Sequence, residues 1–119
     1  MNYNYSPTAD KSFDFAIDIV NTYKELAFNK KEFVLSKQLL RSGTAVGALI
    51  REAQNAESKK DFIHKLGISQ KECDESLYWI DLLKATEYIT DSSHNKLQND
   101  CTQILKLIKR SIITAKSNL

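Results

Sequence analysis

The feature that most constrains the fold of this chain is a run of very small residues inside a strongly helical segment. Residues 35–66 read LSKQLLRSGTAVGALIREAQNAESKKDFIHKL. Apolar residues recur at three- and four-residue spacing on both sides of the Ser-Gly-Thr run, which favours one continuous helix over a break there. Gly43 and Gly47 lie on one helix face, and each costs about 1 kcal/mol of helix stability relative to Ala. Close packing against another helix would offset that cost, so we expect such a contact at both glycines.

The rest of the chain carries three further helical patterns. Only 3 Gly and 1 Pro interrupt the 119 residues. The first helix is expected over residues 11–29 with a cap at Asp10 or Ser12, and the second over residues 33–55. The third follows a capping box formed by Ser58 and Asp61 and ends near residues 85–88. The fourth follows a cap at Asp91 or Ser92. The expected apolar stripe of the first helix is Phe13, Ala16, Ile17, Val20, Tyr23 and Ala27.

Four helices with short connections predict an all-α fold, an up-down-up-down antiparallel four-helix bundle. We expect one domain, with the bundle over residues 11–117 and a flexible N-terminal segment over residues 1–10. The net charge of +2 does not by itself demand a nucleic-acid partner. The N-terminus lacks the features of a signal peptide, and no apolar run approaches the ~20 residues of a membrane span. A cytoplasmic protein without a membrane partner is therefore expected.

A search for catalytic or metal-binding patterns finds little. His64 and His94 are the two histidines, one on a helix and one in an expected turn. Cys73 and Cys101 lack the spacing of a metal site. Counted from the turn between the last two helices, they should be offset axially by roughly 4–8 Å. We therefore interpret both as small core residues, and we expect no enzyme activity, no cofactor and no metal.

Two polar or aromatic groups suggest contacts between helices or subunits. Arg41 and Glu72 lie at matching distances from the turn between the second and third helices, which predicts an interhelical ion pair, with Glu75 as the alternative partner. The other interpretation is that all three are solvated. Tyr78 and Trp79 are adjacent, so they point to different sides of their helix. One of them is expected at an interface between subunits, unless the two simply occupy core and rim.

Basic residues are expected to gather at one pole of the bundle. No acidic residue occurs between Cys101 and Leu119. The end of the fourth helix should lie beside the turn between the second and third, which is also basic. A ring of several subunits would repeat this charge, and weak phosphate contacts add up. The alternative is a solvated end of mixed charge. The candidate nucleic-acid-binding residues are Arg51, Lys59, Lys60, Lys65, Lys106, Lys109, Arg110 and Lys116.

Several motifs together resemble one protein family. The runs LSKQLLRSGTAVGALIREA, SKKDFIHKL and KECDESLYWIDLL are similar to the small four-helix bundle proteins encoded in intervening sequences of bacterial 23S ribosomal RNA genes. KSFDFAIDIVNTYKEL resembles the opening helix of that family, so the similarity spans about residues 11–112. Leu49 stands where the family usually has Asn, and Arg51 where it often has an acid. Any polar site built around that Asn is therefore in doubt here.

The resemblance implies a bundle that assembles into a homopentameric ring. A related branch, the accessory variability determinant of diversity-generating retroelements, works with a reverse transcriptase and nucleic acid. We therefore expect a homo-oligomer that binds RNA or DNA through the basic pole, as a ribonucleoprotein or reverse-transcriptase accessory factor. The second hypothesis is a protein-interaction or assembly module with no nucleic-acid role.

Overall fold

The computed structural model describes residues 6–119 and is entirely helical over that range. No strand occurs among these residues. The expectation of an all-α four-helix bundle is confirmed. The helices are α1 (Pro7–Lys24), which continues into a short π-helical segment η1 (Glu25–Asn29), then α2 (Leu35–Gln54), α3 (Lys59–Ala85) and α4 (Asp91–Ser117).

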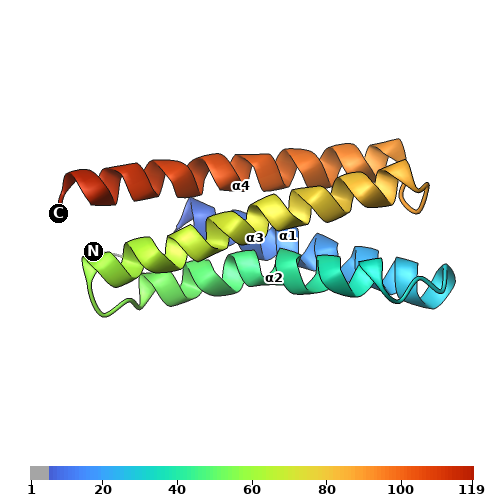
Figure 1. Cartoon of the computed structure of the whole chain (residues 1–119), viewed down its shortest axis with the longest axis horizontal. Coiled ribbons are helices and arrows are strands. Elements are labelled where there is room, and N and C mark those ends of the chain that lie inside the picture. The colour runs from blue at the N-terminus through green and yellow to red at the C-terminus, as the bar shows by residue number, and fades with distance from the viewer. Residues whose placement is uncertain (1–5) are drawn as a thin grey trace.

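The four helices lie side by side along an axis of 47 Å (Figure 1). α1 packs against α2 and α4, and α3 packs against the same two helices, so α1 and α3 sit at opposite corners. The connection between α2 and α3 and the end of α4 lie at one end, which we call the C-terminal end. The other two connections lie at the opposite end. Large apolar side chains fill the centre, among them Phe15, Ile19, Leu39, Ile80, Leu83 and Ile108.

Helix starts follow local capping chemistry. Ser6 caps α1 by accepting a hydrogen bond from the backbone N–H of Ala9 at 3.1 Å, and Pro7 occupies the first helical position, where its missing N–H costs nothing. The helix therefore begins four residues before the predicted residue 11, and neither Asp10 nor Ser12 is its cap. Residues 1–5 of the predicted N-terminal segment lie outside the described residues. Ser58 caps α3 as predicted, with its hydroxyl 3.0 Å from the N–H of Asp61.

α4 is capped one residue earlier than predicted. The hydroxyl of Thr90 accepts a hydrogen bond from the N–H of Ser93 at 3.1 Å, so neither Asp91 nor Ser92 is the cap. The backbone of Thr90 is extended, while the helix starts at the next residue. Threonine is an ordinary N-cap residue, and three consecutive candidates in the sequence made the exact cap ambiguous.

The predicted apolar stripe of the first helix is right at Ala27, which is buried, and wrong at Phe13 and Ile17. Phe13 and Ile17 are exposed, whereas Phe15, Ile19 and Leu26 are buried. α1 is apolar on two adjacent faces, so the periodicity alone gave no choice between them. The choice is made by α2, whose glycines admit the side of α1 that carries Ser12 and Ile19. The second apolar face, with Phe13 and Ile17, is left at the surface.

Candidate nucleic-acid interface

The small residues of α2 let both of its neighbours approach closely. An added Cβ at Gly43 would lie 2.7 Å from Cγ1 of Ile19 in α1, and one at Gly47 would lie 3.1 Å from Oγ of Ser12. On the other side of α2, the hydroxyl of Ser76 donates to that of Ser42 at 2.9 Å. These contacts fix the register of α1, α2 and α3, and hence which charged side chains share each end of the bundle.

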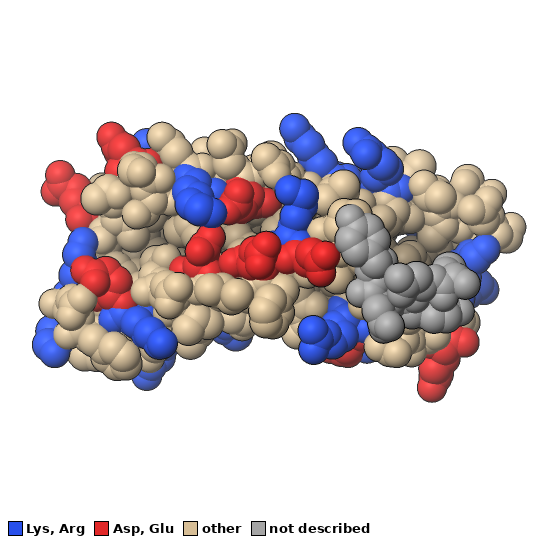
Figure 2. Space-filling view, turned by 180° about the vertical axis from the view of Figure 1, so that it is seen from behind, with Lys and Arg blue, Asp and Glu red and all other residues tan. Residues whose placement is uncertain are grey.

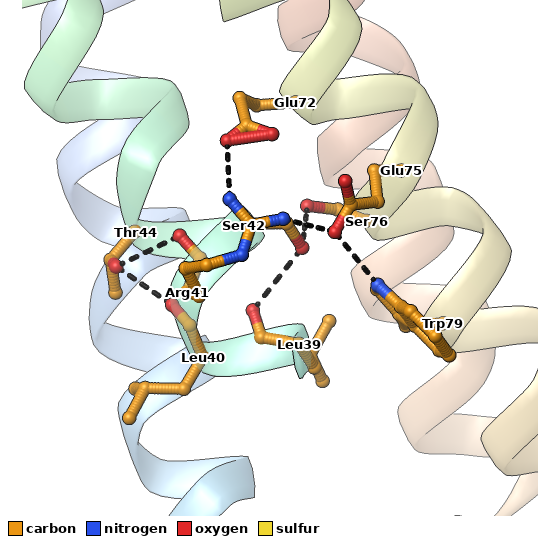
Figure 3. Close-up of polar contacts among 9 residues, drawn as sticks. All are labelled: Leu39, Leu40, Arg41, Ser42, Thr44, Glu72, Glu75, Ser76 and Trp79. Atoms are coloured by element: carbon orange, nitrogen blue, oxygen red, sulfur yellow. Dashed lines mark hydrogen bonds and ion pairs between the residues drawn. The ribbon is translucent and has the colours of Figure 1, made fainter. Parts of the chain in front are cut away.

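The structure brings the predicted interhelical ion pair together (Figure 3). Nη1 of Arg41 lies 2.9 Å from Oε2 of Glu72, and Nη2 contacts the carboxylate of Glu75, so both acids bind the same guanidinium. Nε1 of Trp79 donates to Glu75 at 3.1 Å. The Arg41 side chain is 53% exposed, so the cluster lies at the surface of the α2–α3 contact rather than inside it.

Arg41 and Glu75 each favour the ionised form of the other. The hydrogen bond from Trp79, together with the hydrogen bond and the charge of Arg41, holds the pKa of Glu75 below its ordinary value, although partial burial acts in the opposite direction. Hydrogen bonds to Glu75 and Glu72 raise the pKa of Arg41. The cluster sets one positive charge against two negative charges, a net charge of 1 − 2 = −1, which leaves Arg41 poorly suited to bind an external anion.

The candidate basic residues come from three elements. Lys59, Lys60 and Lys65 lie in the first turns of α3, Arg51 in the last turn of α2, and the other four on the second half of α4. Nζ of Lys59 donates to the backbone oxygen of Asn118 at 2.8 Å, which shows that the end of α4 reaches the start of α3. Lys106 lies eleven residues before the end of α4, roughly 17 Å from that end.

Two of the eight candidates already have polar partners. Lys65 contacts Glu52 at 3.2 Å, and Lys59 is held by Asn118. The acid of the capping box is occupied as well, because Asp61 accepts from the N–H of Glu57 at 3.2 Å. Within residues 6–119, the remaining six have no carboxylate within 4.0 Å, and all are exposed. These six, which we call the free basic set, are Arg51, Lys60, Lys106, Lys109, Arg110 and Lys116.

The side of the bundle that carries α1 has a different charge. Figure 2 shows acidic side chains gathered along the middle of this face. Two of the acids hold one lysine: Nζ of Lys96 lies 2.9 Å from Asp18 and 2.8 Å from Asp100, and these hydrogen bonds raise the pKa of Lys96. An anionic ligand is therefore disfavoured along the acidic middle of this face.

His64 lies on a helix, α3, as expected, whereas His94 and the two cysteines lie differently from the sequence expectation. His94 is in the first turn of α4 rather than in a turn, and its Nε2 lies 2.8 Å from Oδ1 of Asp81. Sγ of Cys101 lies 3.6 Å from the carbonyl oxygen of Cys73, so the predicted axial offset is wrong. The reason is that α3 ends at Ala85, which leaves the two residues nearly equidistant from the turn.

Both thiols are free and fully buried. The contact with Cys101 and burial raise the pKa of the Cys73 thiol. Within residues 6–119, no three His, Cys, Asp or Glu side chains converge as a metal site requires. None of the helices in that range is both long and apolar enough to cross a membrane.

Sequence reasoning missed a surface feature at the opposite end. Phe28, Phe33 and Val34 in the connection between α1 and α2 are all at least half exposed. Glu32 between them receives hydrogen bonds from the N–H groups of Val34, Leu35 and Ser36 and so caps α2. The available signal was the pair Phe33-Val34 directly beside the polar run Asn-Lys-Lys-Glu, where a loop would ordinarily be polar throughout.

The structure thus defines a small all-α bundle, built around one small-residue helix, with separate acidic and basic surfaces. The chain belongs to the family described as 23S rRNA-intervening sequence protein, which it matches over residues 7–110. A crystal structure from Bacteroides thetaiotaomicron VPI-5482, described as a protein of unknown function from the S23 ribosomal protein family, is 53% identical to this chain, with a TM-score of 0.87. The match covers 88% of this chain and 97% of that one. A comparison with curated proteins finds no match to the chain.

Proposed function

We propose that this protein is a non-enzymatic homo-oligomer that binds RNA or DNA without sequence preference. In this proposal, up-down-up-down bundles assemble into a homopentameric ring, and the free basic set of each copy contacts phosphates. The ring would serve in the cytoplasm as a ribonucleoprotein or as an accessory factor of a reverse transcriptase. The name of the family refers to 23S rRNA, so structured RNA is the first ligand to test.

The observation that carries the proposal is the placement of unpartnered positive charge. Six of the eight candidate residues are exposed and, within the described range, lack a carboxylate within 4.0 Å, although the chain contains 15 acidic residues. Four of the six lie on the second half of α4, where no acid occurs after Asp100. Protein charges that remain unpaired on one surface attract an anionic polymer, and affinity grows with the number of phosphates contacted.

The chemistry of these side chains favours backbone binding over base recognition. The stretch of α4 from Lys106 to Lys116 has no aromatic residue on which a base could stack. Lys109 and Arg110 sit on the surface of a helix that is packed in the bundle on its other side, with Ile108 fully buried. Contacts to phosphates position a protein on nucleic acid but carry no sequence information directly.

A second function is supported by a different observation. Tyr78 is exposed, as are the apolar side chains of the α1–α2 connection. Large exposed apolar groups are typical of protein–protein contacts. The alternative is therefore an assembly module whose ring binds a protein partner and no nucleic acid.

A binding measurement separates the two functions. Fluorescence anisotropy would follow a labelled RNA hairpin, an unrelated hairpin and a DNA duplex at 50 and 200 mM salt. The proposal predicts similar affinity for all three and steep weakening with salt. Light scattering on the same sample should give a molecular mass above the 13.6 kDa of one chain. Absence of binding at the lower salt concentration would favour the assembly module.

A further inference from the structure

Two exposed apolar patches lie near the end of the bundle opposite the basic set. The first, which we call the loop patch, consists of Phe28, Phe33 and Val34, which are 61%, 50% and 70% exposed. The chain here is tied down, because the N–H of Glu32 donates to the carbonyl of Leu26 at 2.9 Å and the Glu32 carboxylate caps α2. These hydrogen bonds fix the backbone of the segment, so the three side chains remain exposed to solvent.

The second patch is centred on Tyr78 of α3, which is 60% exposed. Its ring packs edge-to-face against Trp79 with centroids 5.0 Å apart, and Trp79 is in turn anchored by Glu75. A large aromatic held rigidly at the surface loses little conformational entropy on binding, and such residues dominate protein interfaces. This patch lies on a different element from the loop patch, because Tyr78 is on α3, whereas the loop patch lies on η1 and on the residues directly before α2.

The net charges around the two patches are opposite, because residues 24–32 hold three lysines and two glutamates, whereas residues 71–84 hold four acids and two lysines. Asp74 and Asp81 lie one turn before and after Tyr78 on the exposed face of α3. Lys24 and Lys31 flank the loop patch, both are exposed, and neither has a carboxylate within 4.0 Å among residues 6–119. Asp74 likewise has no basic partner in that range. Opposite charges around two apolar centres favour contact between them and disfavour contact of either patch with itself.

The two patches also lie at similar heights along the bundle. Ser42 contacts Ser76 and Arg41 contacts Glu75, so the residue of α2 level with Tyr78 lies between positions 38 and 40. Val34 is four to six residues beyond that level, which is roughly 6–9 Å along the helix. Two copies standing side by side with their helices in the same direction could therefore join one patch to the other.

We propose that the loop patch of one copy binds the Tyr78 patch of the next copy. The contact is head-to-tail, with Tyr78 among Phe28, Phe33 and Val34, and with Asp74 and Asp81 facing Lys24 and Lys31 of the neighbour. A head-to-tail contact between two different surfaces generates a ring when its rotation closes. Because all copies point the same way, every free basic set lies on one side of the ring. This inference rests on the homo-oligomer of the proposed function.

Light scattering on surface variants tests the contact. Val34→Asp and Tyr78→Asp should each convert the oligomer to a species of 13.6 kDa. Ile113→Asp is the matched control, because Ile113 is 69% exposed but lies on α4 near the C-terminal end. It should leave the oligomer mass unchanged. Circular dichroism melts establish that each variant is folded, as expected for changes at exposed positions.

Mixing the two broken variants gives the decisive readout. Val34→Asp retains an intact Tyr78 patch and Tyr78→Asp retains an intact loop patch, so a mixture should form one contact and stop at a 1:1 dimer of 2 × 13.6 = 27.2 kDa. A second, milder test uses charge alone. Lys31→Glu should weaken the oligomer, and adding Asp74→Lys should restore it, because the pair is then reversed.

The outcomes separate this inference from the proposed function. If the wild type is an oligomer and its mass is unchanged in both the Val34→Asp and the Tyr78→Asp variant, the proposed contact is overturned while the homo-oligomer stands. Variants that become monomeric but do not combine when mixed would show that the loop patch and the Tyr78 patch do not bind each other, and would also overturn the inference. A monomeric wild type would overturn the homo-oligomer itself. RNA binding is measured separately and does not bear on the contact.

Discussion

Gly43 faces Ile19 so closely that its missing side chain is a requirement of the fold. A Cβ there would lie 2.7 Å from Cγ1, 2.9 Å from Cδ1 and 2.9 Å from Cγ2 of Ile19. Ile19 is fully buried and β-branched, so it has few alternative rotamers. The helix-propensity cost of this glycine is therefore offset by packing of α1 against α2.

Gly43→Ala should lower the free energy of unfolding by about 1–2 kcal/mol, because overpacking outweighs the gain in helix propensity. Chemical denaturation monitored by circular dichroism measures the change. Gly67→Ala is the matched control, since Gly67 is in the middle of α3 and an added Cβ meets no atom within 4 Å. That control should raise stability by about 0.5–1 kcal/mol. Equal effects of the two substitutions would contradict the packing role of Gly43.

Much of the fold could be predicted because its signals are local. The Ser58 cap and the paucity of Gly and Pro indicated helices from chemistry within a few residues. The small residues of α2 indicated that another helix approaches closely. The face of α1 that packs against them could not be predicted from the sequence of α1 alone, because α1 is apolar on two adjacent faces. Ser12 packs under Gly47 and Phe13 stays outside, although phenylalanine is the more apolar of the two.

The candidate site was predictable only as a collection of charges. From the sequence, Lys65 and Arg51 are equally good candidates for phosphate binding. In the structure Lys65 is paired with Glu52, whereas Arg51 has no carboxylate within 4.0 Å in the described part of the chain. This difference depends on side-chain reach across the α2–α3 connection. The Arg41 cluster was easier, because the turn between its helices is short and counting residues from that turn gives the level.

Because the Glu32 carboxylate caps α2, the free energy of unfolding should depend on pH. Partial burial raises the pKa of Glu32, but hydrogen bonds from the N–H groups of Ser36, Leu35 and Val34 outweigh it and lower that pKa. A lowered folded-state pKa means that the contribution is present above the unfolded value of about 4.3 and is lost as pH falls through the folded value. Glu32→Gln should therefore cost about 1 kcal/mol at pH 7 and less at a pH below the lowered folded-state pKa. A loss of the same size at both pH values would show that charge is not the cause.

The surface cluster of Arg41 should contribute little stability but report clearly on local structure. Arg41→Met should lower the free energy of unfolding by roughly 0.5–1 kcal/mol, since half-exposed ion pairs are screened by solvent. The chain has one tryptophan, and its Nε1 donates to the same carboxylate that binds Arg41. The fluorescence of Trp79 should therefore shift in Arg41→Met and in Glu75→Gln, and the double variant should add no further shift. Lys37→Met, an exposed change one turn away on α2, is the control.

The last prediction concerns the proposed phosphate contacts of Lys60, Lys109 and Arg110, three members of the free basic set; Lys59 is left out because it is held by Asn118. Replacing both Lys109 and Arg110 with Glu changes the net charge from +2 to 2 − 4 = −2. Binding should weaken about equally for unrelated RNA and DNA sequences, and the dependence of affinity on salt should flatten. Each copy in a ring carries the change, so the loss should exceed that expected for two charges. The oligomer mass should stay the same, because these side chains lie at the other end from the loop patch.

The matched control for this variant alters charge elsewhere. Lys37→Glu with Lys71→Glu gives the same net charge of −2, but both lysines lie outside the free basic set, on the exposed faces of α2 and α3. If placement of charge matters, this control retains most of the affinity. Equal weakening by the two double variants would mean that binding follows net charge rather than the surface of α4. In that case the basic surface has no specific role, and the assembly module becomes the better account of the protein.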